Sequence, residues 1–255
     1  MVRANNQTGA RVMRTMMRRG LAALAGAAMM AGAAQAATVA VPLGSMPTPL
    51  TTFFGTDPIP QGTGVTGNMG TGVAFDLGPN AWTADPWYQN NDDVSLTMNT
   101  SLQGVQQVQM LMNTLWGRTD LVNSTISVSF VGLSGQTYTV DLFSGDELRD
   151  YAQNPSFAGA IDGTSGSNGV DAVAWWTATG SATNTGRRID MLTIDLPASF
   201  LGDELVQIIV NDTGNAGQRR ALLMAVNAVT SPVPVPGALL LFVGGLGLMA
   251  RIPRA

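Results

Sequence analysis

The stretch TISVSFVGLSGQTYTVDL, residues 125–142, decides the fold class. Polar and apolar side chains alternate strictly from Thr125 to Phe130, and they alternate again from Thr137 to Leu142. The two runs are joined by a glycine-rich turn over residues 132–135. Because successive side chains of a strand point to opposite faces, each run has one apolar and one polar face. The stretch therefore predicts a β-hairpin with one buried face.

The same period of two recurs through the rest of the body of the chain. Eight or nine short runs, separated by Gly, Asn, Asp and Ser, predict an all-β protein. An antiparallel β-sandwich of jelly-roll type fits this pattern best, and periodicity alone leaves a barrel or an immunoglobulin-like order open. Besides the hairpin, strands are expected around residues 73–77, 94–98, 108–112, 170–178, 192–196, 205–210 and 221–229.

Two segments depart from simple alternation. Residues 205–210 and 221–229 are more continuously apolar, so they are expected to lie centrally and to be covered on both faces. The best helical candidate begins at a capping box, Ser144 to Glu147, and continues for about two turns over residues 148–152.

The N-terminus has the three parts of a secretory signal peptide. Five arginines and no acid lie in residues 1–19, and an apolar stretch follows over residues 21–34. The small-x-small triplet Ala34-Gln35-Ala36 then predicts cleavage after Ala36. We therefore expect a signal peptide over residues 1–36 and an exported β-sandwich domain over residues 37–230.

The composition of the body excludes several kinds of chemistry. The chain has no cysteine and no histidine, which rules out the usual zinc sites, cysteine nucleophiles and Ser-His-Asp triads. All 17 acids lie between Asp57 and Asp212, where only six arginines oppose them, giving the body a net charge of −11. Such a surface repels phosphate backbones, so no nucleic-acid partner is expected.

One stretch offers a candidate glycan-binding site. Residues 82–93 are the densest mixture of aromatic, amide and carboxylate side chains in the sequence. Sugars present apolar C–H faces and a fringe of hydroxyls, which suit an aromatic platform beside polar groups. The alternative is that the tryptophans cover the end of the core. The candidate residues are Trp82, Trp87, Tyr88, Asn90 and Asp92.

The acids allow two further hypotheses. Asp92, Asp93, Asp146 and Glu147 are weak candidates for a Ca²⁺ site on loops, with solvated surface acids as the alternative. No other cofactor is expected. A pair of loop carboxylates could also make a secreted glycan-active hydrolase, but nothing in the spacing selects a pair, and the non-enzymatic interpretation is preferred.

The C-terminus carries a short apolar run between prolines and arginines. Residues 237–250 have no charge and would span about 21 Å as a helix, which is short against about 30 Å of bilayer hydrocarbon. Arginines after the run place the body outside and the basic tip in the cytoplasm. We expect residues 231–255 to hold the chain transiently at the inner membrane through a short transmembrane helix.

These terminal residues resemble the PEP-CTERM sorting signal. The resemblance rests on a Pro-x-Pro motif, a Leu- and Gly-rich stretch and a basic end, with Val235 where the family's motif usually has glutamate. It implies recognition by an exosortase-like sorting enzyme, and delivery to the cell surface or to an extracellular exopolysaccharide matrix. The residues that carry it are Val233, Pro234, Val235, Pro236, Gly237, Arg251 and Arg254.

The body is loosely similar to the passenger domains found on such signals. The similarity lies in residues 111–117, in residues 188–190 leading to Leu196 and Pro197, and in residues 218–223. It implies a β-sandwich, with the galactose-binding-like kind as one form, and assigns no sugar contact. The sequence thus predicts an exported, non-enzymatic β-sandwich protein that binds glycan or serves a structural role.

Overall fold

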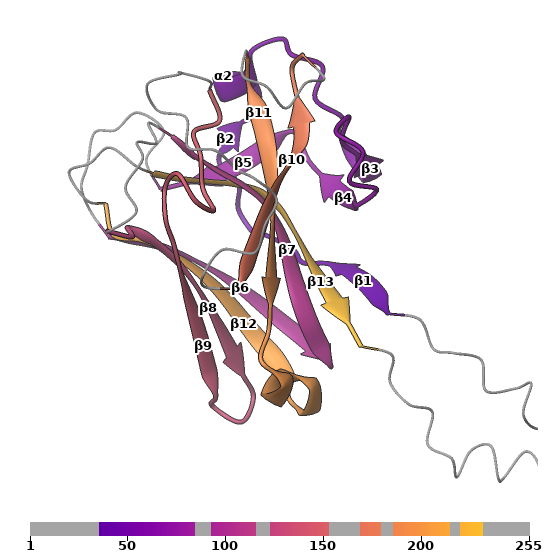
Figure 1. Cartoon of the computed structure of the whole chain (residues 1–255), viewed down its shortest axis with the longest axis vertical. Coiled ribbons are helices and arrows are strands. Elements are labelled where there is room, and N and C mark those ends of the chain that lie inside the picture. Colours follow the sequence, from indigo (N-terminus) through magenta and orange to yellow (C-terminus); the bar gives the residue numbers. More distant parts are fainter. Residues whose placement is uncertain are drawn as a thin grey trace, which may run out of the picture. The chain divides into compact units, whose positions relative to one another are not determined.

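The computed structural model describes residues 36–84, 93–115, 123–152, 169–179, 186–214 and 220–231. These residues belong to one compact unit, Ala36–Ser231. The unit consists mostly of antiparallel strands, which confirms the all-β prediction (Figure 1). No helix in the described ranges is both long and apolar enough to cross a bilayer, and the apolar run at residues 237–250 lies outside those ranges.

Two sheets make up most of the unit. The four-stranded sheet has the order β6-β12-β8-β9, and the larger sheet has the order β10-β11-β7-β13-β5-β2 with β1 also paired to β13. Strands of the smaller sheet are β6 (Val94–Gln103), β8 (Ile126–Gly132), β9 (Thr137–Leu142) and β12 (Glu204–Asp212). Those of the larger sheet are β1 (Ala37–Ala40), β2 (Thr48–Pro49), β5 (Asn80–Thr83), β7 (Val105–Leu115), β10 (Val170–Thr177), β11 (Arg188–Asp195) and β13 (Arg220–Thr230).

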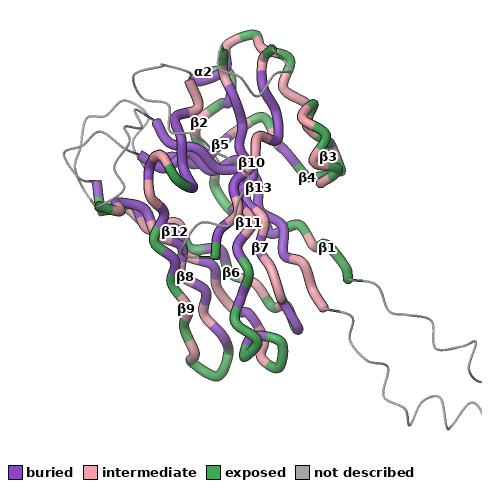
Figure 2. Tube along the Cα trace, in the orientation of Figure 1, coloured by how far each residue is buried: buried purple, intermediate pink, exposed green. Residues whose placement is uncertain are grey.

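The two sheets pack face to face around a shared apolar core. Met98, Phe130 and Ile208 of the smaller sheet lie in the same buried cluster as Met110 and Leu223 of the larger one. The other face of the larger sheet is also covered, by helix α2 (Thr51–Phe54) and by the hairpin of β3 (Gly62–Thr66) and β4 (Ala74–Leu77). Strands β11 and β13 of the larger sheet are therefore buried on both faces, and the smaller sheet is buried on one (Figure 2).

The predicted hairpin is confirmed. Strands β8 and β9 pair antiparallel from Ile126↔Leu142 to Val131↔Thr137, and the apolar positions of both strands face the core. The prediction for residues 221–229 is also confirmed, since β13 lies inside its sheet and is buried along nearly its whole length. The prediction for residues 205–210 is half wrong. Strand β12 is central, but its burial alternates, because the outer face of its sheet has no covering layer among the described residues.

The predicted helix over residues 148–152 does not form. The Glu147 carboxylate does reach back, but it accepts from the backbone N–H of Phe143 (2.7 Å), one residue before the expected cap. The chain then continues as an extended segment between β7 and β11. These strands pair only as far as Leu111↔Met191 and then separate. We call residues 149–152 the inserted segment; it forms a parallel bridge with Thr114 and an antiparallel bridge with Arg187.

The half-buried carboxylate of Asp203 connects the tip of the β8–β9 hairpin to the start of β12. Asp203 accepts from the hydroxyl of Ser134 (2.7 Å), from the side-chain amide of Gln136 (2.9 Å) and from the backbone N–H of Glu204 (2.9 Å). The Asp203 carboxylate lies so close to the backbone of Gly132 that a Cβ atom at this position would be 2.1 Å from a carboxylate oxygen. The bond from Ser134, followed by those from Glu204 and Gln136, lowers the pKa of Asp203 below its usual value of 3.8.

This contact makes a pH-dependent contribution to stability. A carboxyl whose pKa is lower in the folded state stabilises the fold above its unfolded-state pKa, and the contribution is lost as the pH falls through the folded-state pKa. Asp203→Asn should therefore lower the midpoint of thermal unfolding at pH 7 and leave it unchanged near pH 2. Asp93→Asn removes the same charge at an exposed position and is the control. A deficit of the same size at both pH values would contradict the assignment.

Candidate functional site

The outer face of the four-stranded sheet carries an array of hydroxyl and amide side chains. Strand pairing sets these residues in three rows across β6, β12, β8 and β9. Residues directly opposite one another on paired strands share a face, so each row points outward together. The rows are Ser95, Asn211, Ser127 and Asp141; Thr97, Ile209, Ser129 and Thr139; and Asn99, Gln207, Val131 and Thr137. We call these residues the polar face.

The side chains of the polar face hydrogen-bond to one another across the strands. Ser95 Oγ donates to Asn211 Oδ1 (2.8 Å), Gln207 Nε2 donates to Asn99 Oδ1 (3.1 Å), and the hydroxyls of Ser129 and Thr139 lie 2.9 Å apart. Each bond uses only part of what these groups can donate and accept. The bonds therefore order the side chains and leave capacity for a ligand.

The polar face has little charge and a size suited to a polymer. Asp141 is its only ionisable member, and it contains no lysine or arginine. With strands about 4.8 Å apart and rows about 6.8 Å apart, it measures about 14 Å in each direction. All members on β6 and β9 are exposed, and those on β8 and β12 are half-buried. Such a surface favours neutral ligands that both donate and accept hydrogen bonds.

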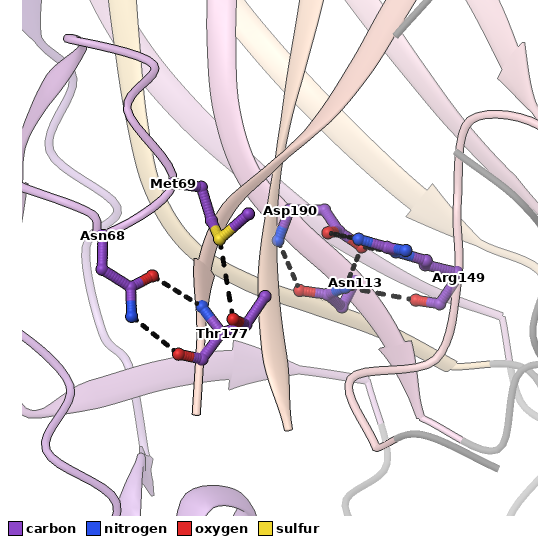
Figure 3. Close-up of polar contacts among 6 residues, drawn as sticks. All are labelled: Asn68, Met69, Asn113, Arg149, Thr177 and Asp190. Carbon is purple, nitrogen blue, oxygen red and sulfur yellow. Dashed lines mark hydrogen bonds and ion pairs between the residues drawn. The ribbon is translucent and has the colours of Figure 1, made fainter. Parts of the chain in front are cut away.

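A second polar group is buried where the inserted segment meets β11 (Figure 3). The guanidinium of Arg149 donates to both carboxylate oxygens of Asp190, from Nε and from Nη2, each at 2.7 Å. Asn113 Nδ2 donates to the same carboxylate (2.7 Å), and Asn113 Oδ1 accepts from the Asp190 backbone N–H (3.1 Å). Burial raises the pKa of Asp190, and the bonds from Arg149 and Asn113 oppose that rise. This group fixes the inserted segment in place.

A further buried ion pair joins the two sheets. The guanidinium of Arg220 on β13 donates to Asp212 Oδ1 on β12 (2.8 Å), and both side chains are almost fully buried. Asp212 Oδ2 also accepts from the backbone N–H of Ala221 (2.7 Å). The pair has the geometry of a structural connection, since both partners are committed to the protein itself.

Two clefts lie elsewhere on the unit. The first, about 270 Å³, lies beside the end of β10 and is lined by Pro58, Pro60, Thr66, Gly67, Asn68, Trp176, Thr177 and Ala178. The second, about 360 Å³, lies between the start of the domain and β6, and is lined by residues 39–42 and 99–102. Among the described residues no carboxylate lines either cleft, so these residues do not supply the acid pair that a glycosidase needs.

The first cleft is bordered by a contact that covers the edge of β10. The side-chain amide of Asn68 donates to the Thr177 carbonyl (2.8 Å) and accepts from the Thr177 N–H (3.0 Å), as a paired strand would (Figure 3). Met69 N–H donates to the carbonyl of Trp175 (3.2 Å). We call residues 67–69 the edge clasp.

Of the five sequence-predicted glycan residues, the described part of the structure contains only Trp82. Trp82 is 7 % exposed and belongs to the core between the two sheets, where β5 pairs with β13. Its ring is therefore not available as a platform, because burial in the core takes up the area that a sugar would contact. Trp87, Tyr88, Asn90 and Asp92 lie outside the described residues.

The structure describes three of the four acidic candidates. Asp92 lies outside the described residues, Asp93 and Asp146 are exposed, and Glu147 is buried with its carboxylate on the Phe143 N–H. Within the described ranges, no group of three or more acids could hold a metal ion. The residues of the expected sorting motif, from Val233 to Gly237 with Arg251 and Arg254, also lie outside them.

Sequence reasoning missed the polar face, although its signal was present. The alternating runs place Ser127 and Ser129 of β8, and Thr137 and Thr139 of β9, on the side away from the core. Alternation within one strand shows only that these positions face away from the core. That they align across four strands depends on pairing between residues more than 100 positions apart, such as Ser95 and Asn211. A comparison of the chain with protein families, curated proteins and solved structures finds no match.

Proposed function

We propose that this chain is an exported, non-enzymatic β-sandwich protein that binds neutral glycan through the polar face. The observation that carries the proposal is the ordered array of hydroxyl and amide groups across β6, β12, β8 and β9. Sugar hydroxyls donate and accept hydrogen bonds, and serine, threonine, asparagine and glutamine side chains do the same. The hydrogen-bonding groups of the polar face are therefore complementary to those of a neutral sugar.

The polar face favours a polymer over a single sugar. Exposed hydrogen bonds contribute only about 0.5–1.5 kcal/mol each, because water competes for the same groups. A repeating polysaccharide meets the three rows in succession, and a second site on the same polymer binds at high effective concentration. Retention in an exopolysaccharide matrix would then come from many weak contacts.

The glycan proposal predicts the behaviour of two matched double variants. Thr97→Val with Thr139→Val removes two hydroxyls from the middle row and keeps the shape of the side chains. Retention on immobilised neutral polysaccharide (a glucan, a galactan and a mannan) should weaken about tenfold, which corresponds to about 1.4 kcal/mol. Thr51→Val with Thr52→Val makes the same change at exposed positions of α2 and should bind as the unaltered chain does. Equal retention of both double variants would refute the role of the polar face.

Export and sorting form the second part of the proposal. The signal peptide expected over residues 1–36 and the PEP-CTERM-like segment over residues 231–255 support passage to the inner membrane and handling by an exosortase-like enzyme. The domain then resides at the cell surface or in the extracellular matrix.

Deleting residues 233–255 tests the sorting step. The described fold ends with Ser231, whose N–H donates to the Gly104 carbonyl (2.7 Å), so the deletion spares the strand pairings of β13 that the structure describes. The truncated chain should appear in the medium with an unchanged circular dichroism spectrum and unfolding midpoint. Surface retention equal to that of the full chain would exclude a sorting role for the tail.

A jelly-roll order is the finer fold assignment that we propose. It is supported by the strand sequence in the two sheets: β5-β13-β7-β11 on one side faces β6-β12-β8-β9 on the other. In this order most consecutive strands cross between the sheets, and the β8–β9 hairpin stays within one, as in a jelly roll of two Greek keys. Strand β10 then extends one edge.

A further inference from the structure

Two leucines stand out on the surface of the domain. Leu133 is 67 % exposed and Leu201 is 44 % exposed, and no other large apolar side chain in the described ranges is exposed. Leu133 lies in the turn of the β8–β9 hairpin. Leu201 lies in the 3₁₀ helix η1 (Ala198–Gly202), which leads into β12. Both side chains thus point into water from connections between strands, where they contribute nothing to the core.

The two leucines belong to the same end of the sandwich. The backbone N–H of Leu133 donates to the carbonyl of Glu204 (2.8 Å), three residues after Leu201. The Asp203 carboxylate joins the same two segments, through its bonds from Ser134 and Gln136. Figure 1 shows the hairpin turn and η1 together at the lower end of the view. We call residues 132–135 and 198–202 the leucine end.

The described chain also ends here. The N–H of Ser231 donates to the carbonyl of Gly104 (2.7 Å), and a Cβ atom on Gly104 would lie 3.8 Å from the carbonyl oxygen of Leu201. Only residues 232–236 separate Ser231 from the apolar run at residues 237–250, and five extended residues span at most about 18 Å. A membrane that holds the run therefore lies within reach of this end of the domain.

The charge at the leucine end suits neutral lipid. None of its residues is ionisable, and Asp203 and Glu204, which follow it, accept hydrogen bonds from Ser134 and Gln103. Leucine side chains that enter the interface of a bilayer lose contact with water, which is favourable in proportion to the apolar area buried. An anionic surface would instead repel the acidic body.

We propose that Leu133 and Leu201 insert into the interface of a neutral lipid bilayer and dock the domain end-on. The proposal rests on the membrane hold proposed above, and it adds a second contact beside the tail. A bilayer is the occupant that the structure favours, because the apolar run after Ser231 brings one to this end. The polar face extends along the strands away from the leucine end, so end-on docking leaves it open to glycan.

Fluorescence quenching in the full-length chain tests the contact, because the chain has no cysteine of its own. Ser199→Cys places one fluorescent label on the leucine end, at an exposed position. Asp93→Cys places it at the opposite end of β6, about 30 Å away. The labelled chains are reconstituted into phosphatidylcholine vesicles that carry a nitroxide at the top of the acyl chains. The label at position 199 should be quenched, and the label at position 93 should not.

Two double variants of the Ser199→Cys chain separate the leucines from the tail. Leu133→Ser with Leu201→Ser should reduce the quenched fraction about tenfold, because almost no apolar area is then left to bury. Leu133→Met with Leu201→Met keeps that area and is the matched control, with quenching as in the unaltered chain. Equal quenching in both would mean that the tail alone brings the domain to the bilayer. Energy transfer between labels at position 199 in detergent would assign the leucines to a second copy of the chain. Either result would overturn the proposal.

Flotation of the same vesicles distinguishes the docking contact from the membrane hold. A chain that floats with the vesicles but shows no quenching at position 199 contradicts the contact and leaves the hold intact. A chain that does not float with them refutes the hold, and the docking contact with it.

Discussion

Asp190→Ala should lower the free energy of unfolding by about 3–5 kcal/mol, because removing one partner of a buried ion pair leaves the other charge uncompensated. Asp190 is fully buried and accepts both bonds of the Arg149 fork. Without it, the guanidinium of Arg149 would lose both of these acceptors and keep the like charge of Arg188 nearby. Urea unfolding followed by tryptophan fluorescence measures the loss, since Trp82, Trp175 and Trp176 are buried.

A double replacement separates the charge effect from the loss of packing. Arg149→Met with Asp190→Leu removes both charges and keeps apolar volume, a change that is often neutral in buried pairs. The double variant should recover at least half of the stability that Asp190→Ala loses. A loss below about 1 kcal/mol for Asp190→Ala would mean that water reaches the site and screens Arg149.

Gly67→Ala should cost about 2–4 kcal/mol by displacing the edge clasp. A Cβ atom on Gly67 would lie 1.9 Å from the backbone oxygen of Trp175 and 2.6 Å from its carbonyl carbon. Because both are backbone atoms of a buried strand, the loop rather than β10 must move. The bonds from Asn68 to Thr177 and from Met69 to Trp175 would then be lost together.

Gly202→Ala is the matched control for this effect. A Cβ atom on Gly202 meets nothing within 4 Å, so the unfolding free energy should change by less than about 0.5 kcal/mol. Size-exclusion chromatography adds a second readout for Gly67→Ala, because a strand edge that loses its cover pairs readily with other chains. If the two alanine variants unfold alike and both stay monomeric, the clasp has no role in stability.

The fold class could be predicted from local pattern because the core of this domain is built from alternating strands. Phe130 and Val140 reveal their buried face within a few residues of sequence. The sequence pattern gave the wrong burial for β12. Ile209 makes this stretch continuously apolar, but its side chain is only half-buried and does not belong to the core. Ile209 instead lies between Thr97 and Ser129 on the polar face, where the methyl group of a threonine can contact it.

The buried group of Asn113, Arg149 and Asp190 could not be predicted from local sequence, since its contacts join distant parts of the chain. Asn113 meets Asp190 across 77 residues, and Arg149 meets it across 41. The capping-box pattern at Ser144 and Glu147 was a local signal, and the inserted segment overrode it because its backbone bonds to Thr114 and Arg188 replace those of a helix. Trp82 was a candidate for a surface site for a similar reason. A sequence pattern rich in aromatic and amide residues does not show which aromatic ring will be buried in the core.

The central place of β13 has a consequence for the order of folding. This strand pairs with β1, β5 and β7, yet it is the last strand of the described chain, and Thr230 lies opposite Ala37 across 193 residues. Until residues 220–230 arrive, three strands lack the neighbour that completes their hydrogen bonds. Contacts this remote in sequence close slowly, and a growing chain cannot make them early. For the export proposed above, this late closure of the larger sheet would favour passage of the chain through a secretion channel before it folds.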